Sequence, residues 1–82
     1  MKENLKQMNK RLCMSEYSHF NGEYYITFNI VCIDTDKNEI TVAVSNQGKV
    51  SIVKFDLVQN KNGCLYFEYG RSFDKISLDD FE

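Results

Sequence analysis

The 82-residue chain contains no proline, no tryptophan and a single histidine, and its four glycines are dispersed at positions 22, 48, 63 and 70. Dispersed glycines do not form the glycine-rich loops that bind nucleotide phosphates. His19 has no orienting partner at a recognisable spacing, so a Cys–His catalytic pair with Cys13 is not expected. The acidic pair Asp79–Asp80 is interpreted as solvated, because so small a domain has little room for a cleft between two catalytic carboxylates. The sequence therefore predicts a protein without enzymatic activity.

Long apolar segments are also missing. The longest nearly uncharged stretch, residues 24–33, is half the length of a membrane span and is interrupted by Thr27 and Asn29. The lysines near the N-terminus are not followed by an apolar run, so a secretory signal is not expected. We therefore expect no membrane association and a cytoplasmic location.

The three cysteines are too few and too widely spaced for either of the usual cysteine-based frameworks. Cys13, Cys32 and Cys64 are an odd number, which disfavours a set of disulfides, and they lack the close pairs of a zinc site. Cys32 has the inward phase of a predicted strand, where a thiol acts as a small apolar group. The oxygen-rich segment 34–38 lacks the glycine and the distal glutamate of a calcium loop, so we interpret it as a hairpin turn. We expect reduced thiols, no metal and no cofactor.

An alternation of apolar and polar residues runs from position 23 to position 59. The apolar fraction of the whole chain, 43%, and its charged fraction, 27%, are typical of a globular protein, and the length suits one domain spanning residues 1–82. A period of two indicates strands with one buried face, here predicted at 23–34, 39–45, 49–59 and 64–69, with a short fifth strand near 76–78. A phase slip at Ile52–Val53 predicts a β-bulge there, which would curve the sheet. The predicted core comprises Tyr24, Ile26, Phe28, Ile30, Val42, Val44, Ile52 and Leu65.

A helix is predicted before these strands. Leu5, Met8 and Leu12 recur at helical spacing within residues 3–14, which gives a narrow apolar stripe that either covers the sheet or joins a second copy in a homodimer. The predicted fold class is therefore α+β: a short N-terminal helix (1–14) followed by a four- to five-stranded, strongly curved antiparallel meander with an acidic tail (22–82). A small SH3-like or OB-like barrel is the alternative if the bulge closes the sheet.

The charges are unevenly distributed along the chain. Residues 1–13 carry four bases and one acid, whereas the other 69 residues carry eleven acids and six bases, so that +3 and −5 sum to the net charge of −2. With five tyrosines and six phenylalanines, the chain has more aromatic side chains than so small a core is expected to bury. We predict that exposed aromatics and acidic groups together bind a protein partner. The predicted partner-binding residues are Tyr17, Phe20, Tyr25, Asp34, Asp36, Glu39, Tyr66, Tyr69, Asp74, Asp79 and Asp80.

The short, proline-free composition, rich in asparagine and lysine, resembles that of small accessory proteins of phages and mobile elements in AT-rich bacteria. This resemblance favours a stoichiometric inhibitor or adaptor, whose acidic surface occupies a basic groove on a nucleic-acid-handling enzyme. The alternative is a small nucleic-acid-binding domain in which sheet aromatics stack on bases and a basic helix contacts phosphates. The acidic sequence pI of about 5.3 opposes that alternative. Its candidate phosphate contacts are Lys2, Lys6, Lys10 and Arg11.

Overall fold

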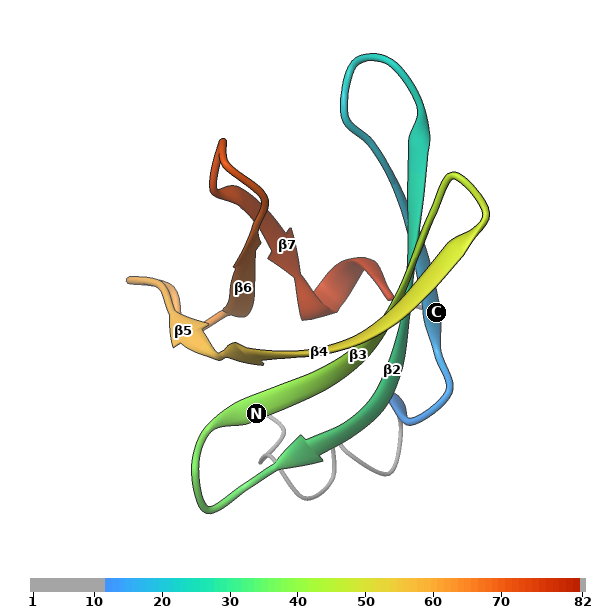
Figure 1. Ribbon diagram of the computed structural model, residues 1–82. Coiled ribbons are helices and arrows are strands. Elements are labelled where there is room, and N and C mark those ends of the chain that lie inside the picture. The colour runs from blue at the N-terminus through green and yellow to red at the C-terminus, as the bar shows by residue number, and fades with distance from the viewer. Residues whose placement is uncertain (1–11, 82) are drawn as a thin grey trace.

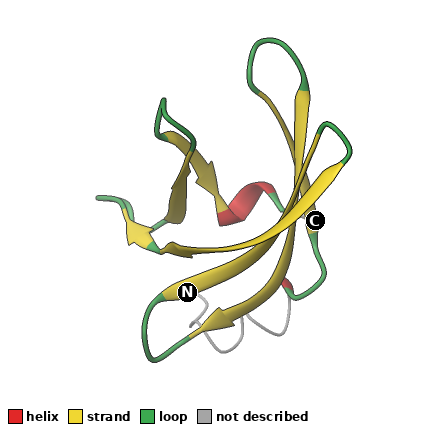
Figure 2. Cartoon of the chain, viewed as in Figure 1, coloured by secondary structure: helices red, strands yellow, loops and turns green. Residues whose placement is uncertain are grey.

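Strands account for 60% of the residues that the computed structural model describes, 12–81, and helical residues for 6% (Figures 1 and 2). The predicted α+β class is therefore wrong, and the described part of the chain is nearly all β. Its elements are β1 (Glu16–Phe20), β2 (Tyr25–Asp34), β3 (Glu39–Asn46), β4 (Lys49–Asp56), β5 (Val58–Gln59), β6 (Leu65–Tyr69), β7 (Asp74–Ser77) and the 3-10 helix η1 (Leu78–Asp80).

The strands form two antiparallel sheets instead of the single meander that was predicted. The large sheet has the order β1-β2-β3-β4, and the small sheet has the order β5-β6-β7. The predicted third strand, 49–59, divides at Leu57, whose N–H donates to the carbonyl of Asn38 at 2.8 Å. Beyond this point the chain joins the small sheet, and Figure 1 shows β4 and β6 diverging from β5. The division into two sheets lets a short chain enclose a core between them.

Only the last three residues of the helix predicted for 3–14 are described: Leu12 is helical, and Cys13 and Met14 form a turn. After Leu12 the chain turns, and Met14 has a positive φ of 72°, which a helix does not allow. The Met14 N–H then donates to the carbonyl of Ile30 at 2.8 Å, so the main chain already follows β2. Residues 1–11, including the rest of the predicted helix and its proposed dimer contact, lie outside the described part.

Strand β1 lies between the predicted helix and the predicted meander, in a segment where no strand was predicted. It pairs with β2 from Glu16 opposite Asn29 to Phe20 opposite Tyr25. Tyr17 and His19 are the residues of this strand that face inward, and both are polar at one end, so the apolar alternation in the sequence is too weak to indicate a strand.

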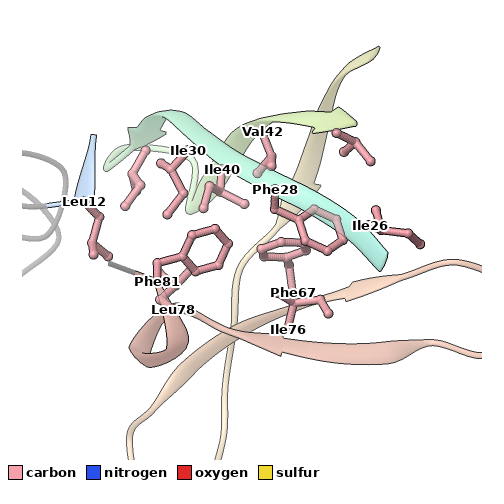
Figure 3. Packing of buried hydrophobic residues seen from close by; sticks show 12 residues of the cluster. Leu12, Ile26, Phe28, Ile30, Ile40, Val42, Phe67, Ile76, Leu78 and Phe81 are labelled. Carbon is pink, nitrogen blue, oxygen red and sulfur yellow. The ribbon is translucent and has the colours of Figure 1, made fainter. Parts of the chain in front are cut away.

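The core lies between the two sheets, with Phe67 near its centre (Figure 3). The Phe67 ring stacks on Phe55 with a centroid distance of 4.7 Å and meets Phe28 edge-on at 5.7 Å. These contacts connect the large sheet to the small one through aromatic surface. The buried apolar residues are Leu12, Ile26, Phe28, Ile30, Ile33, Ile40, Val42, Val44, Phe67, Ile76, Leu78 and Phe81.

The predicted core is partly confirmed. Five of its members on β2 and β3 are buried, and Tyr24 and Leu65 pack against the core while remaining partly exposed. Ile52 was predicted to be buried, but it lies on the opposite face, with 64% of its surface exposed.

Ile52 was placed on the wrong face because the β-bulge was predicted on the wrong strand. Strands β3 and β4 pair without a register shift, whereas the β2–β3 ladder shifts between Ile30 and Cys32. The additional residue, Val31, leaves both Val31 and Cys32 exposed and returns Ile33 to the core. The prediction that Cys32 faces inward is therefore also wrong.

Two isoleucines provide a direct test of this register. Ile40 is fully buried and Ile52 is mainly exposed, although both lie on neighbouring strands. We expect Ile40→Ala to lower the free energy of unfolding by about 2–5 kcal/mol, and Ile52→Ala to change it by less than about 1 kcal/mol. Urea denaturation of both variants measures the difference. Equal losses at the two positions would contradict the assigned faces of β4.

Candidate functional site

The predicted partner-binding residues do not form one continuous site. Tyr25 begins β2 and Asp34 ends it, and ten residues of extended chain separate the two ends by about 30 Å. The acidic β2–β3 turn therefore lies at the opposite end of the large sheet from the β1–β2 and β3–β4 turns (Figure 1). The aromatic and acidic groups predicted to act together occupy separate regions of the molecule.

Phe20 and Tyr25, two of the predicted partner-binding residues, lie side by side on the large sheet. They are directly opposite each other where β1 and β2 meet, and their ring centroids are 5.0 Å apart. Both rings lie on the outer face of the large sheet, meaning the face that points away from the core, and they are 50% and 66% exposed. Exposed, rigid rings of this kind supply contact area at a protein interface.

The acidic turn is built by the chain itself. The Asp34 Oδ1 atom accepts hydrogen bonds from the backbone N–H groups of Asp36 and Lys37, at 3.0 and 3.2 Å. Glu39 is paired with Asp34 across the strand ladder, and Asp36 is exposed. Asp34 thus stabilises the turn, as the hairpin interpretation predicted, and Asp36 is the carboxylate of this turn that is most available to a partner.

His19 joins the two sheets through the Nε2 atom of its ring. Its Nε2 atom lies 3.4 Å from the Oδ2 of Asp74 on β7, and its Nδ1 atom lies 3.4 Å from the hydroxyl of Tyr17. The Cys13 thiol donates elsewhere, to the carbonyl of Val31 at 3.2 Å. The arrangement of these groups explains how the edge strand β1 is held against the small sheet.

The environment of Tyr17 disfavours ionisation of its phenol and so shifts its pKa. Burial raises the pKa of Tyr17 above its ordinary value of 10.0, and the negative charge of Asp80 raises it further. Both effects disfavour the phenolate, the first by desolvation and the second by repulsion. Asp79 and Asp80 themselves are exposed in η1, where the Ser77 hydroxyl accepts a hydrogen bond from the Asp79 N–H.

We expect the Tyr17 phenol to ionise later than a free tyrosine in an alkaline titration. The proton is held more tightly in the folded chain, so the stability that it contributes is complete below pH 10 and is lost as the pH rises through the folded pKa. The difference in tyrosinate absorbance between the parent and Tyr17→Phe isolates this group. Asp80→Asn should move its midpoint downward, and a midpoint at or below 10.0 in the parent would contradict the assignment.

Tyr66 and Tyr69, two further predicted contacts, are both partly buried. The Lys75 Nζ atom lies 5.4 Å from the centre of the Tyr66 ring, where the face of the ring attracts the cation. Tyr69 packs edge-on against Phe28 at 5.0 Å, so most of its role is in the core.

The remaining surface of Tyr69 lines a groove between β6 and the β3–β4 hairpin. The groove has a volume of about 360 Å³. Its lining residues are Val44, Asn46, Gln47, Lys49, Ser51, Val53 and Tyr69. Among the described residues, the Asn46 Oδ1 atom is buried and has no hydrogen-bond partner. The sequence did not indicate this groove, because its walls come from strands that belong to different sheets.

Sequence reasoning also missed two exposed apolar residues on β4. Ile52 was assigned to the core, yet Val50 and Ile52 are 66% and 64% exposed on the outer face. Opposite them on β3 are the small residues Ser45 and Ala43, so nothing on the neighbouring strand covers them. The sequence did carry a signal for this exposure. Val50 and Ile52 alternate on one face of the strand while Val53 lies on the other, so apolar residues had to be present on both faces.

The structure also bears on metal binding, membrane-spanning helices and the cysteines. Within residues 12–81, no group of three His, Cys, Asp or Glu side chains is arranged to hold a metal ion. No helix in the same range is long and apolar enough to cross a membrane. The three cysteines are free thiols. The basic residues of the alternative nucleic-acid site, Lys2, Lys6, Lys10 and Arg11, lie outside the described part.

The geometry therefore offers one surface with interface character, the outer face of the large sheet, and one groove beside its β4 edge. No protein-family model, curated protein or solved structure matches the chain.

Proposed function

We propose that this chain is a non-catalytic module that binds another protein and acts stoichiometrically, as an inhibitor or adaptor. The observation that supports the proposal best is the exposure of Phe20, Tyr25, Val50 and Ile52 on one face of the large sheet. Tyr25 and Val50, the nearest members of the aromatic and apolar pairs, lie on strands two spacings (about 10 Å) apart and are offset by two residues along the strands. Exposed apolar surface of this kind marks interaction sites in small proteins.

The residues between the two pairs are small or polar. The Ser18 hydroxyl lies 3.0 Å from that of Thr27 across the β1–β2 ladder, and Ser45 and Ala43 follow on β3. A sheet face with short side chains in the middle and large side chains at its edges is suited to a flat or slightly convex partner surface. The acidic groups of the β2–β3 turn and of η1 lie apart from this face, and we assign them a role in steering the partner at longer range.

The test is quantitative capture with matched variants. Immobilised full-length chain is incubated with lysate from its native host, and the captured proteins are quantified by mass spectrometry, then purified and titrated calorimetrically. We expect one protein at a molar ratio near one, with affinity lowered about tenfold or more by Tyr25→Ser, because tyrosine anchors are enriched among the residues that dominate binding energy.

Met14→Ser is the matched control, since Met14 is even more exposed but lies outside the outer-face patch. Equal loss of binding in both variants would contradict the assigned surface. If the purified chain instead retards DNA or RNA at near-physiological salt, and neutralising Lys2, Lys6, Lys10 and Arg11 abolishes that retardation, the nucleic-acid alternative replaces the proposal.

A further inference from the structure

Strand β4 is an edge of the large sheet. It pairs with β3 on one side, and within residues 12–81 no strand pairs with its other side over Lys49–Val53. Nearer its end, β4 packs on the small sheet through Phe55, which stacks on Phe67. Because β6 diverges from β4 beyond that stack, the first five residues of β4 have an open edge, about 16 Å long.

The backbone groups on this edge can be assigned from the hairpin. Gln47 and Gly48 form a two-residue turn in which both have positive φ, 50° and 84°, and Asn46 is opposite Lys49. In such a hairpin the flanking pair is hydrogen-bonded, and bonded and non-bonded pairs then alternate. The N–H and C=O groups of Val50 and Ile52 therefore point away from β3, toward the open edge.

Three features thus coincide at this edge. Val50 and Ile52 provide free backbone groups and also expose their apolar side chains on the outer face. On the inner face, Lys49, Ser51 and Val53 line the groove, which is closed on its far side by Tyr69. An added strand would gain hydrogen bonds along the edge, apolar neighbours on one face and a groove for its other side chains.

The charges indicate which strand fits. β4 carries Lys49 in the groove and Lys54 on the outer face, and within the described residues neither has a carboxylate within ion-pair distance. A second copy of β4 would bring two more lysines to the same narrow strip, and lysine on an edge strand is a common protection against self-pairing. An acidic partner strand would instead neutralise Lys49, and an inward hydroxyl donor would satisfy the buried Asn46 Oδ1.

We propose that the open edge of β4 binds an extended segment of a partner protein by strand addition, and that this segment alternates apolar residues with polar ones and carries an acidic residue opposite Lys49. This proposal rests on the proposed protein-binding function and specifies its partner chemistry. The incoming strand pairs its backbone with Val50 and Ile52, places its apolar side chains beside theirs on the outer face, and directs its polar side chains into the groove.

The test uses the full-length chain and a synthetic acetylated peptide, Thr-Val-Thr-Val-Glu, which in antiparallel register places valines opposite Ile52 and Val50 and glutamate opposite Lys49. Binding is followed by nuclear magnetic resonance, through amide shifts and through hydrogen exchange at Val50 and Ile52. We expect saturable binding that slows exchange at these two amides by about tenfold or more, because they become hydrogen-bonded. The Val31 amide, which is at the β2 bulge, should be unaffected.

Two control peptides separate the contributions. Methylation of both valine nitrogens keeps the side chains but removes the donors, and should weaken binding by about tenfold or more. Replacing glutamate with lysine should weaken binding by about fivefold, and this difference should shrink at high salt.

A chain variant tests the edge itself. Ile52→Pro removes an N–H that is not hydrogen-bonded to β3, so the variant should keep the fold, as judged by its amide spectrum. It should no longer bind the peptide. Ile52→Thr keeps the N–H and should retain part of the binding.

Several results would overturn the proposal. These are unshifted Val50 and Ile52 amides at millimolar peptide, equal binding of the glutamate and lysine peptides, or slow exchange at both amides without peptide in a chain that sediments as a dimer. In the last case a second copy occupies the edge. If the peptide does not bind while Tyr25→Ser still reduces capture of the partner, strand addition is excluded, and the proposal that the outer face binds a protein is retained.

Discussion

Replacing Phe67 with alanine is expected to lower the free energy of unfolding by about 3–5 kcal/mol, a large part of the stability of so small a domain. The Phe67 side chain is fully buried and contacts the rings of Phe28, Phe55 and Phe81. Because Phe67 belongs to the small sheet, while Phe28 and Phe55 belong to the large sheet and Phe81 follows η1, its loss leaves a cavity where all three meet. Thermal denaturation followed by circular dichroism should show a melting temperature lower by at least about 12 °C, or an unfolded chain.

Phe73→Ala is the matched control for this variant. Phe73 is the same residue type, lies in the β6–β7 turn and is among the exposed large apolar residues. Its replacement should change the free energy of unfolding by less than about 0.5 kcal/mol. Comparable losses at positions 67 and 73 would mean that the small sheet does not pack on the large one as described.

Leu12→Ala is expected to have the second-largest effect, a loss of about 2–5 kcal/mol. Leu12 is 1% exposed and belongs to the same core as Phe28 and Phe81, although it precedes the first strand. The Ser15 N–H donates to its carbonyl at 2.8 Å, and the Met14 N–H donates to the carbonyl of Ile30, so the turn that follows Leu12 is fixed against β2. Urea denaturation provides the measurement.

Met14→Ala controls for this segment, since Met14 is adjacent in the turn but almost fully exposed. We expect a change of less than about 0.5 kcal/mol at that position. If Leu12→Ala is as mild as Met14→Ala, then the segment before β1 is not docked, and the free-energy contribution assigned to Leu12 is wrong.

The candidate surfaces were only partly predictable from the residues. Exposure of Phe20 and Tyr25 was expected, and the structure brings their rings together because the β1–β2 pairing places them opposite each other. The exposure of Val50 and Ile52 was not expected, since apolar residues at alternating positions indicate a buried face. The groove at Lys49 was not predictable either, because it depends on the angle between two sheets.

By itself, the amino-acid sequence determined the positions of most strands and turns. Alternation at Ile26, Phe28 and Ile30 and again at Val42 and Val44 is a local property, since side chains of a strand point to opposite faces in turn. The two-residue turn at Gln47–Gly48 is local for the same reason, because glycine readily adopts positive φ.

Only the tertiary structure decided how these strands combine. The location of the bulge at Val31, the division of the predicted third strand at Leu57 and the pairing of β1 all depend on contacts between residues distant in sequence. Apolar residues on both faces of β4 are compatible with either face being inside, and packing against Phe67 selects the face that carries Val53 and Phe55. That selection leaves Val50 and Ile52 outside, because a strand paired on one side can bury only one of its faces against a single small core.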